Sequence, residues 1–218
     1  MTDPAVSKLL EKVTKHGKPL RAYTKGSVIH GGGRMGLIRG YTYVLTAEPG
    51  RDFAPEFAPA LTPAEMLFMG VFEGKYLNDC YDEFPQEWYL MAAAHGKLSP
   101  GKPNVSCNYF GVDSRQPLSV WRKNGWAPRP RGPALADATG RAMLAGRVSN
   151  PDERGGFQWY CRYWLGRRIP ELDAVQIGRW RSFTRHVGAV KKGCARGDLE
   201  CRRRERQALL QWAYNPFI

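Results

Sequence analysis

The spacing of apolar residues along the chain predicts a fold made mostly of helices. Apolar side chains recur every three or four positions, the period of a helix packed on one face, in residues 5–16, 86–95, 117–124, 157–165 and 199–214. Only residues 41–46, with the sequence YTYVLT, are typical of a strand. We therefore expect a mainly α fold, formally α+β, in which residues 1–218 form a single helical domain with a small N-terminal β element.

One helix start is marked strongly in the sequence. Thr62 is followed by Pro63 and, three residues after the threonine, by Glu65. A hydroxyl at the N-cap, proline at the first helical position and glutamate at the third form a capping box. The helical pattern is predicted to resume over residues 71–81, which would place Lys75 and Asp79 one turn apart.

Residues 171–190 read as one long helix with a broad apolar arc. Arg181 and Arg185 lie on the opposite side, where a basic stripe would follow the phosphates of a polyanion. Arg179 and His186 fall inside the apolar arc, and burying an unpaired arginine is costly. Either both side chains reach the edge of the arc or bond the backbone, or they line a polar pocket that faces inward.

The charge of the chain predicts its class of partner. There are 33 Lys+Arg against 20 Asp+Glu, a net charge of +13, and the 43% of hydrophobic residues are too many for a disordered chain. Residues 151–218 hold 14 of the basic and 7 of the acidic residues, together with Trp159, Trp164, Trp180 and Trp212. Basic and aromatic side chains together suit a nucleic-acid surface, so we expect nucleic acid as the partner, DNA rather than RNA.

The cysteines and the N-terminus indicate the compartment. Residues 1–20 lack the apolar core of a signal peptide, and no apolar run approaches the roughly 20 residues that span a bilayer. Five cysteines without a secretory context predict reduced thiols, a cytoplasmic location, no membrane partner and, by default, a monomer. Cys194 and Cys201 would bind zinc only with help from Cys161 or His186, so plain thiols are the favoured interpretation.

The string FQWYCRYWLGRR (residues 157–168) supplies further candidates for contact with nucleic acid. Gln158 and Arg162 share a helix face, and an exposed Trp159 would stack on a base. The alternative is a packed aromatic helix with a polar backing. The predicted nucleic-acid contacts are Gln158, Trp159, Arg162, Arg167, Arg168, Arg179, Arg181 and Arg185.

The acidic segment EGKYLNDCYDE (residues 73–83) contains most of the candidates for catalysis. Lys75 beside Asp79 would be an amine nucleophile of the kind that a base-excision lyase uses. Alternatively, Asp79 with Asp82 or Glu83 would hold Mg²⁺ for phosphodiester cleavage. His186 completes the catalytic candidates. An ordinary salt bridge on a solvated helix explains the same spacing, and the sequence requires no cofactor and no metal.

Residues 30–36 formally contain a GxGxxG motif. No helix is predicted after it, and no acidic residue follows at the ribose-binding distance, so a dinucleotide site is not expected. A loop that contacts phosphates through backbone amides and Arg34 remains the functional interpretation of this stretch.

Four strings are specific enough to compare with known families. They are LTPAEMLFMGVFEGKYLNDC (61–80), NYFGVDSRQPLSVW (108–121), FQWYCRYWLGRR (157–168) and RQALLQWAYNPF (206–217). The chain from about residue 41 to 218 thereby resembles a family of small uncharacterised proteins scattered through bacteria, fungi and large viruses. The resemblance implies no established activity and supplies no catalytic residues.

Residues 127–156 differ from their surroundings, with PRPRGP at one end and SNPDERGG at the other. The family pattern passes more directly from Gly125-Trp126 to the FQWY helix. We therefore expect residues 127–156 to be a surface insertion or loop, with one short helix at 134–145 and no essential chemistry.

Three interpretations of function follow. The first is a nucleic-acid-binding protein that processes DNA, for example a DNA glycosylase or lyase. The second is a small-molecule enzyme whose polar pocket gathers Lys75, Asp79, Arg162, Arg179 and His186. The third is a non-catalytic interaction module in which these residues are dispersed. Convergence of the residues in one pocket would separate the three.

Overall fold

The computed structural model describes residues 3–31, 41–116, 118–123, 135–136, 142–144 and 147–218. The α-helices are α1 (Pro4–His16), α2 (Pro63–Met69), α3 (Gln86–Ala94), α4 (Leu118–Lys123), α5 (Gly156–Leu165), α6 (Pro170–Ser182), α7 (Thr184–Gly193) and α8 (Arg203–Leu210). Short 3-10 helices are η1 (Leu20–Ala22), η2 (Phe72–Gly74) and η3 (Val105–Cys107). The mainly α fold with a small β element is confirmed.

The strands form two small antiparallel sheets. β1 (Val28–His30) pairs with β2 (Thr42–Val44), in the register Ile29 opposite Tyr43. β3 (Leu135–Ala136), β4 (Ala142–Leu144) and β5 (Arg147–Ser149) form the second sheet in sequence order. The strand expected at residues 41–46 is therefore confirmed as β2.

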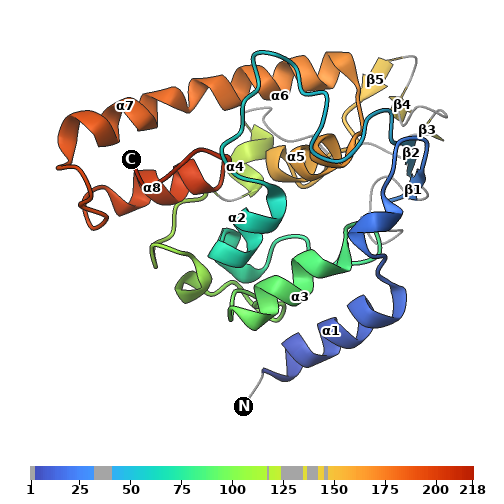
Figure 1. Cartoon of the computed structure of the whole chain (residues 1–218), viewed down its shortest axis with the longest axis horizontal. Helices are drawn as coiled ribbons and strands as arrows, with labels where there is room; N and C mark the ends of the chain where they lie inside the picture. Colours follow the sequence, from blue (N-terminus) through green and yellow to red (C-terminus); the bar gives the residue numbers. More distant parts are fainter. Residues whose placement is uncertain (1–2, 32–40, 117, 124–134, 137–141, 145–146) are drawn as a thin grey trace.

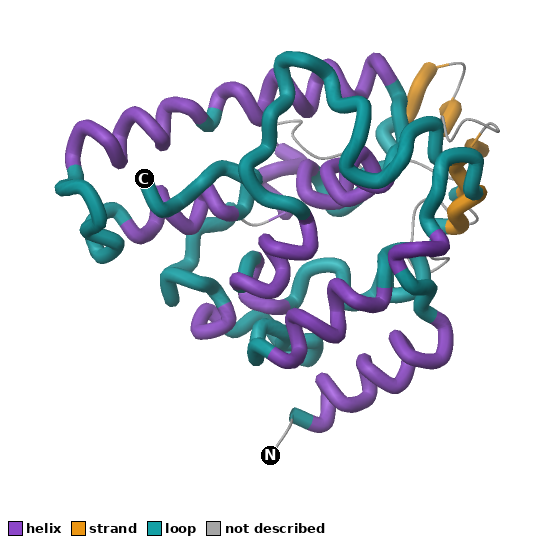
Figure 2. The backbone as a smooth tube through the Cα atoms, viewed as in Figure 1, coloured by secondary structure: helices purple, strands orange, loops and turns teal. Residues whose placement is uncertain are grey.

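The helices pack as a bundle with α1 at one edge and α6–α7 at the other (Figure 1). α3 contacts both α1 and α2, α2 contacts α5, and α5 contacts α6. α7 turns back through a loop so that α8 packs against it, as the backbone trace shows (Figure 2). None of the described helices combines the length and apolar character of a bilayer-crossing segment.

Local signals set the starts of two helices, and the first of them is the one that the sequence predicts. The Thr62 side chain accepts a hydrogen bond from Glu65 N at 3.2 Å, and Glu65 Oε2 accepts from Thr62 N at 2.6 Å. This capping box starts α2, and Asp3 caps α1 by accepting from Ala5 N at 2.8 Å. Each such cap stabilises a helix by about 0.5–2 kcal/mol.

An aromatic cluster fills the core between α5, α6 and the loop before α2. Phe57 lies at its centre, with ring centroids 5.0–5.6 Å from those of Trp159, Tyr160, Tyr163 and Trp180. Edge-to-face packing of this kind stabilises aromatic pairs beyond the area they bury. The cluster fixes the position of α5 in the middle of the fold.

A network of buried charges joins α5 to distant segments. Arg162 on α5 forms a two-pronged pair with Glu83, at 2.6 Å from Nε to Oε1 and 3.0 Å from Nη2 to Oε2. Its Nη1 donates to Asp152 Oδ1 at 3.0 Å. Arg167 forms a second two-pronged pair with Asp152, at 2.8 and 2.7 Å. All four side chains are fully buried, so two positive and two negative charges neutralise one another inside the core.

Tyrosines of the N-terminal β element complete this network. The Tyr43 hydroxyl donates to Glu83 Oε1 at 3.1 Å, and Arg167 Nη1 donates to the Tyr41 hydroxyl at 3.2 Å. The Arg162 guanidinium also lies 4.8 Å from the centre of the Tyr41 ring. Burial alone would raise the pKa of Asp152, but Arg167 and Arg162 together outweigh it and lower that pKa. A buried charge is tolerable only with such partners.

The predicted helix at residues 71–81 is wrong. This stretch is the 3-10 helix η2 followed by turns, and Phe72, Glu73 and Leu77 have positive φ angles of 50°, 54° and 62°. Gly70 ends α2 with a φ of 106°, and a Cβ there would lie 1.9 Å from the carbonyl oxygen of Cys107, so glycine is needed where the chain leaves the helix. The helical spacing of Lys75 and Asp79 was therefore no guide to their relative position.

The predicted single helix at residues 171–190 is divided into α6 and α7 at Phe183. The hydroxyls of Ser182 and Thr184 donate to the carbonyls of Arg179 and Arg181, at 2.6 and 2.8 Å. Hydroxyls that bond the preceding turn compete with the helical ladder and bend it. The last helix is also shorter than the predicted residues 199–214, since α8 spans Arg203–Leu210.

The predicted surface insertion at residues 127–156 is wrong at its C-terminal end. Asp152 is fully buried in the charge network and Glu153 is 7% exposed. The short helix expected at residues 134–145 is also wrong, because the described parts of that stretch are the strands β3 and β4. Residues 32–36 of the glycine-rich motif lie outside the described residues.

Two of the five cysteines are oxidised. Cys194 and Cys201 form a disulfide with a Cα–Cα distance of 5.7 Å, whereas Cys80, Cys107 and Cys161 are buried and form no disulfide. The expectation of five reduced thiols is therefore wrong for this pair. Once oxidised, the pair does not ligate zinc.

We expect Glu83→Gln to destabilise the fold by about 3–5 kcal/mol, because it leaves the buried Arg162 guanidinium without its main counter-charge. The same substitution at Glu200, whose carboxylate is 82% exposed and 3.2 Å from Arg203, is the matched control and should cost under about 1 kcal/mol. Urea denaturation of both variants measures the difference. Equal effects would show that the buried network contributes no more than a surface pair.

Candidate functional site

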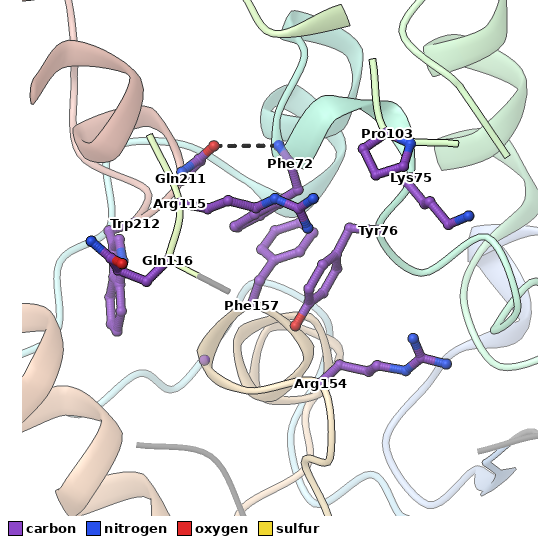
Figure 3. Close-up of a pocket in the computed structure, with 11 residues that line it drawn as sticks. Phe72, Lys75, Tyr76, Pro103, Arg115, Gln116, Arg154, Phe157, Gln211 and Trp212 are labelled. Atoms are coloured by element: carbon purple, nitrogen blue, oxygen red, sulfur yellow. Dashed lines mark hydrogen bonds between the residues drawn. The ribbon is translucent and has the colours of Figure 1, made fainter. Parts of the chain in front are cut away.

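Two adjoining cavities open among α5, α7, α8 and the segments that carry Phe72 and Arg115. The small cavity has a volume of 260 Å³ and reaches Gly156 at the start of α5 (Figure 3). The large cavity has a volume of 680 Å³ and extends along α7 and α8. They share the lining residues Phe72, Arg115, Gln116, Gln211 and Trp212, so they form one continuous hollow, which we call the cationic groove.

Positive charge dominates the lining of the cationic groove. The basic residues of the two cavities are Lys75, Arg115, Arg154, Arg179, Arg185, His186 and Arg204. Glu205 is the one acidic residue among the described residues of this lining, and it accepts a hydrogen bond from Arg202 at 3.1 Å. A concave surface with one sign of charge raises the local concentration of oppositely charged ligands.

Aromatic rings form the walls of both cavities. In the small cavity the Phe72 ring centroid lies 4.6 Å from that of Tyr76 and 5.2 Å from that of Phe157. In the large cavity Trp212 and Phe183 are stacked, with centroids 4.3 Å apart and planes 21° apart. The groove thus combines cations with flat apolar faces.

The segment that carries Phe72 is held in its unusual backbone conformation by contacts with residues 97–108. Gly74 has a φ of 68°, and a Cβ there would lie 2.7 Å from Lys97 O. Glu73 N donates to Asn108 Oδ1 at 2.8 Å. Left-handed backbone at non-glycine residues costs of the order of 1–3 kcal/mol and concentrates at functional sites.

Two glutamines on α8 and just beyond it fix this segment to the other side of the groove. Gln207 Nε2 donates to Gly70 O at 3.1 Å, and Gln207 Oε1 accepts from Phe110 N at 3.1 Å. Gln211 Oε1 accepts from Phe72 N at 3.3 Å (Figure 3). Both glutamines are almost fully buried, so the groove wall is built from tertiary hydrogen bonds.

Glu73 positions Arg115. The carboxylate is 2% exposed and its Oε2 lies 2.5 Å from Arg115 Nη2. Oε1 is buried without a hydrogen-bond partner among the described residues. Burial raises the pKa of Glu73 against the opposing effect of Arg115, and the nearby Asp113 raises it further. A carboxyl with these properties behind a cavity is a candidate functional group.

The N-terminus of α5 and Arg154 form the opposite end of the small cavity. Gly155 occupies the N-cap with a φ of 85° and offers no side chain to the first turn. Arg154 precedes it, with its backbone N donating to Gln158 Oε1 at 3.0 Å and its guanidinium paired with Asp79. Backbone N–H groups at a helix start attract anions.

Two residues of the large cavity have shifted pKa values. Burial lowers the pKa of Arg179 to about 10, so this side chain still carries its charge at neutral pH. Burial, together with the neighbouring Arg185, lowers the pKa of His186 below its usual 6.5. His186 is therefore mostly neutral at pH 7, when it can accept as well as donate a hydrogen bond.

Four of the eight residues predicted to contact nucleic acid are buried in the core, so they cannot make these contacts. Gln158, Trp159, Arg162 and Arg167 are 0–2% exposed, so the exposed Trp159 expected from the sequence is a core residue. Its Nε1 donates to Asp173 Oδ1 at 2.7 Å. The packed aromatic helix, the alternative interpretation, is the observed one.

The remaining predicted contacts are split between two regions. Arg179 and Arg185 line the large cavity. Arg168 instead lies over the Tyr163 ring, 3.9 Å from its centre, and Nη2 donates to Arg51 O at 2.7 Å. Arg181 borders a separate hollow beside Trp180. The cationic groove therefore includes only two of the eight predicted contacts.

The predicted catalytic residues do not converge on one point. Lys75 lines the small cavity, but its side chain is exposed and Nζ donates to Gly101 O at 2.8 Å. Asp79 pairs with Arg154, and His186 lines the large cavity. Asp82 borders a third cavity with His16 and His30. An exposed lysine lacks the desolvation that a nucleophilic amine needs.

The magnesium hypothesis also lacks the required geometry. Within the described ranges, no three His, Cys, Asp or Glu residues are grouped so as to hold a metal ion. Glu83 is fully buried against Arg162, and Asp79 and Asp82 serve different cavities. The three carboxylates proposed for Mg²⁺ are therefore dispersed.

Sequence reasoning missed most of the groove. The groove residues without a prior assignment are Phe72, Tyr76, Arg115, Arg154, Gly156, Phe157, Arg204 and Gln211, together with Glu73 behind Arg115. Most of them lie in or next to the four strings used for the family resemblance. The available signal was that Gly70 and Gly74 flank Phe72 and Glu73. Two glycines this close together disfavour a helix.

Comparison of the chain with protein-family models, curated proteins and solved structures finds no match. The family resemblance drawn from the four strings stays a prediction.

The raised pKa of Glu73 predicts a pH-dependent difference between the protein and its Glu73→Gln variant. Because the folded state binds this proton more tightly, the contribution of Glu73 to stability is present below its ordinary pKa of 4.5 and is lost as pH rises through the raised value. Wild type should therefore lose stability relative to Glu73→Gln between about pH 4 and about pH 7. Urea denaturation at both pH values measures this difference, and a constant or opposite trend would contradict the assignment.

Proposed function

We propose that the protein binds nucleic acid, with DNA as the first substrate to test, through the cationic groove. The observation that carries the proposal is the gathering of six cationic side chains and His186, from five separate parts of the chain, around one hollow. Neutralising phosphates with arginine and lysine releases counterions and supplies most of the affinity in such complexes.

The aromatic walls favour a single-stranded or locally opened nucleic acid. Trp212 stacks on Phe183, and the Arg179 guanidinium lies 5.4 Å from the centre of a Trp212 ring. Bases stack on aromatic and guanidinium faces without regard to sequence, with about 1–3 kcal/mol per base. In a duplex the faces of the bases are covered by their neighbours, so a base can stack on the protein only after it has left the duplex stack.

Processing of DNA bases belongs to the same proposal but has less support. The lyase interpretation depends on Lys75, which is exposed, and the metal-dependent interpretation depends on carboxylates that lie apart. The small-molecule interpretation required Arg162 in the pocket, and Arg162 is fully buried in the core network. We therefore propose binding as the primary function.

The compartment is also part of the proposal. We place the protein in the cytoplasm on the basis of Cys80, Cys107 and Cys161, which are buried and form no disulfide. The Cys194–Cys201 disulfide is the observation against this placement, because such bonds are rare in reducing compartments.

We expect fluorescence anisotropy with short single-stranded and duplex DNA to show that log affinity falls linearly with log salt concentration. The slope should correspond to at least about four neutralised phosphates. The double variant Arg185→Ala, Arg204→Ala removes two exposed groove cations and should make the slope shallower by about 2.

The double variant Lys8→Ala, Lys25→Ala is the matched control, since it removes the same net charge from exposed residues outside the groove. The slope of its log affinity against log salt concentration should differ from that of wild type by less than about 1. The proposal is refuted by absence of binding at about 50 mM salt, or by equal losses in the two double variants.

A further inference from the structure

We propose that the small cavity holds a single nucleotide, with its base against the aromatic wall and its phosphate at Arg154 and the N-terminus of α5. This inference rests on the proposed function and assigns one part of the groove a specific occupant. The small cavity would then accept one unit of a strand whose backbone follows the large cavity.

The size of the small cavity limits its occupant. At 260 Å³ it lies just below the range of about 300–1,000 Å³ that is usual for ligand pockets. Such a space admits a single ring system with its substituents and excludes a base pair. A base that enters it must therefore have left its stack, as in enzymes and binding proteins that extrude one nucleotide.

The walls of the small cavity match a base. The rings of Phe72, Tyr76 and Phe157 are in mutual contact, with Tyr76 and Phe157 centroids 5.6 Å apart (Figure 3). All three residues line the cavity and give it an apolar wall, and base–aromatic stacking tolerates every base. Gln211 Oε1 already accepts a hydrogen bond from Phe72 N. The group of Gln211 left to bond a base is therefore its amide nitrogen, which donates.

One end of the small cavity, at Arg154 and the start of α5, matches a phosphate. Arg154 is oriented by one carboxylate, that of Asp79. A guanidinium has five N–H donors, so one carboxylate contact leaves donors for a ligand while fixing the side chain in place. The uncapped N-terminus of α5 opens at Gly156 on the same cavity and adds its dipole.

Gly156 keeps this cavity open. A Cβ at Gly156 would lie 3.2 Å from Trp212 Cη2 and 3.4 Å from Gln176 Oε1, so a side chain there forces the cavity wall to move. A larger residue at this position would narrow the space for a base. Trp212 and Gln176 also contact Arg179, so the change would reach one cation of the large cavity.

The test measures binding of the four deoxynucleoside 5′-monophosphates, of the unphosphorylated nucleosides and of inorganic phosphate by isothermal titration calorimetry at low salt. The monophosphates should bind more tightly than either part alone. Arg154→Ala should weaken them about tenfold, as expected for loss of a charge-assisted hydrogen bond. Arg51→Ala, an exposed arginine outside the groove, is the matched control and should leave binding unchanged.

A second variant and a parallel measurement separate the outcomes. Gly156→Val should weaken the monophosphates and make the salt slope for oligonucleotides shallower by no more than about 1, the share of one phosphate, with its folding checked by thermal denaturation. Oligonucleotide binding without monophosphate binding would overturn this inference and leave the proposed function standing. Monophosphate binding without oligonucleotide binding would overturn the proposed function and leave the nucleotide site standing. Inorganic phosphate that binds as tightly as the monophosphates would reduce the site to an anion site and overturn the inference.

Discussion

The pairing of Arg162 with Glu83 and Asp152 is the interaction on which the rest of the structure depends. Two guanidinium groups and two carboxylates lie in the core with no exposure to solvent. Each would be costly alone, and the cost is offset only because every charge faces an opposite one at hydrogen-bond distance. The network therefore dictates how α5, the segment before α3 and the loop before α5 are placed relative to one another.

The cationic groove is a consequence of that placement. α5 begins at the small cavity with Gly156 and Phe157, and the same helix carries Arg162 into the core network. On the facing side, Gln207 and Gln211 bind the backbone of Gly70 and Phe72. The buried charges fix one wall and the buried amides fix the other, so exposed arginines are presented by a rigid frame rather than by loops alone.

The sequence predicted local features well and long-range partners poorly. The capping box at Thr62 and the strand at β2 depend on neighbouring residues, and both were predicted. The conformation of Glu73 depends instead on the carbonyl oxygens of Cys107 and Lys97, which exclude side chains at Gly70 and Gly74. Arg162 looked like a surface residue because its counter-charge lies 79 residues earlier in the chain. Two of the eight predicted contacts, Arg162 and Arg167, failed for this reason, since an arginine resembles a binding residue until its buried counter-charge is known.

The long separation of these partners also governs how the chain acquires its structure. Arg162 and Glu83 are 79 residues apart, and Arg167 and Tyr41 are 126 residues apart. Contacts across such separations require closure of long loops before they contribute any stability, which slows folding. A collapsed chain with α5 in the interior but Glu83 elsewhere would bury the Arg162 guanidinium without its counter-charge. Such a state is unstable and would unfold again. Productive collapse therefore requires both halves of the chain at once, and a fragment taken from either half has no route to this core.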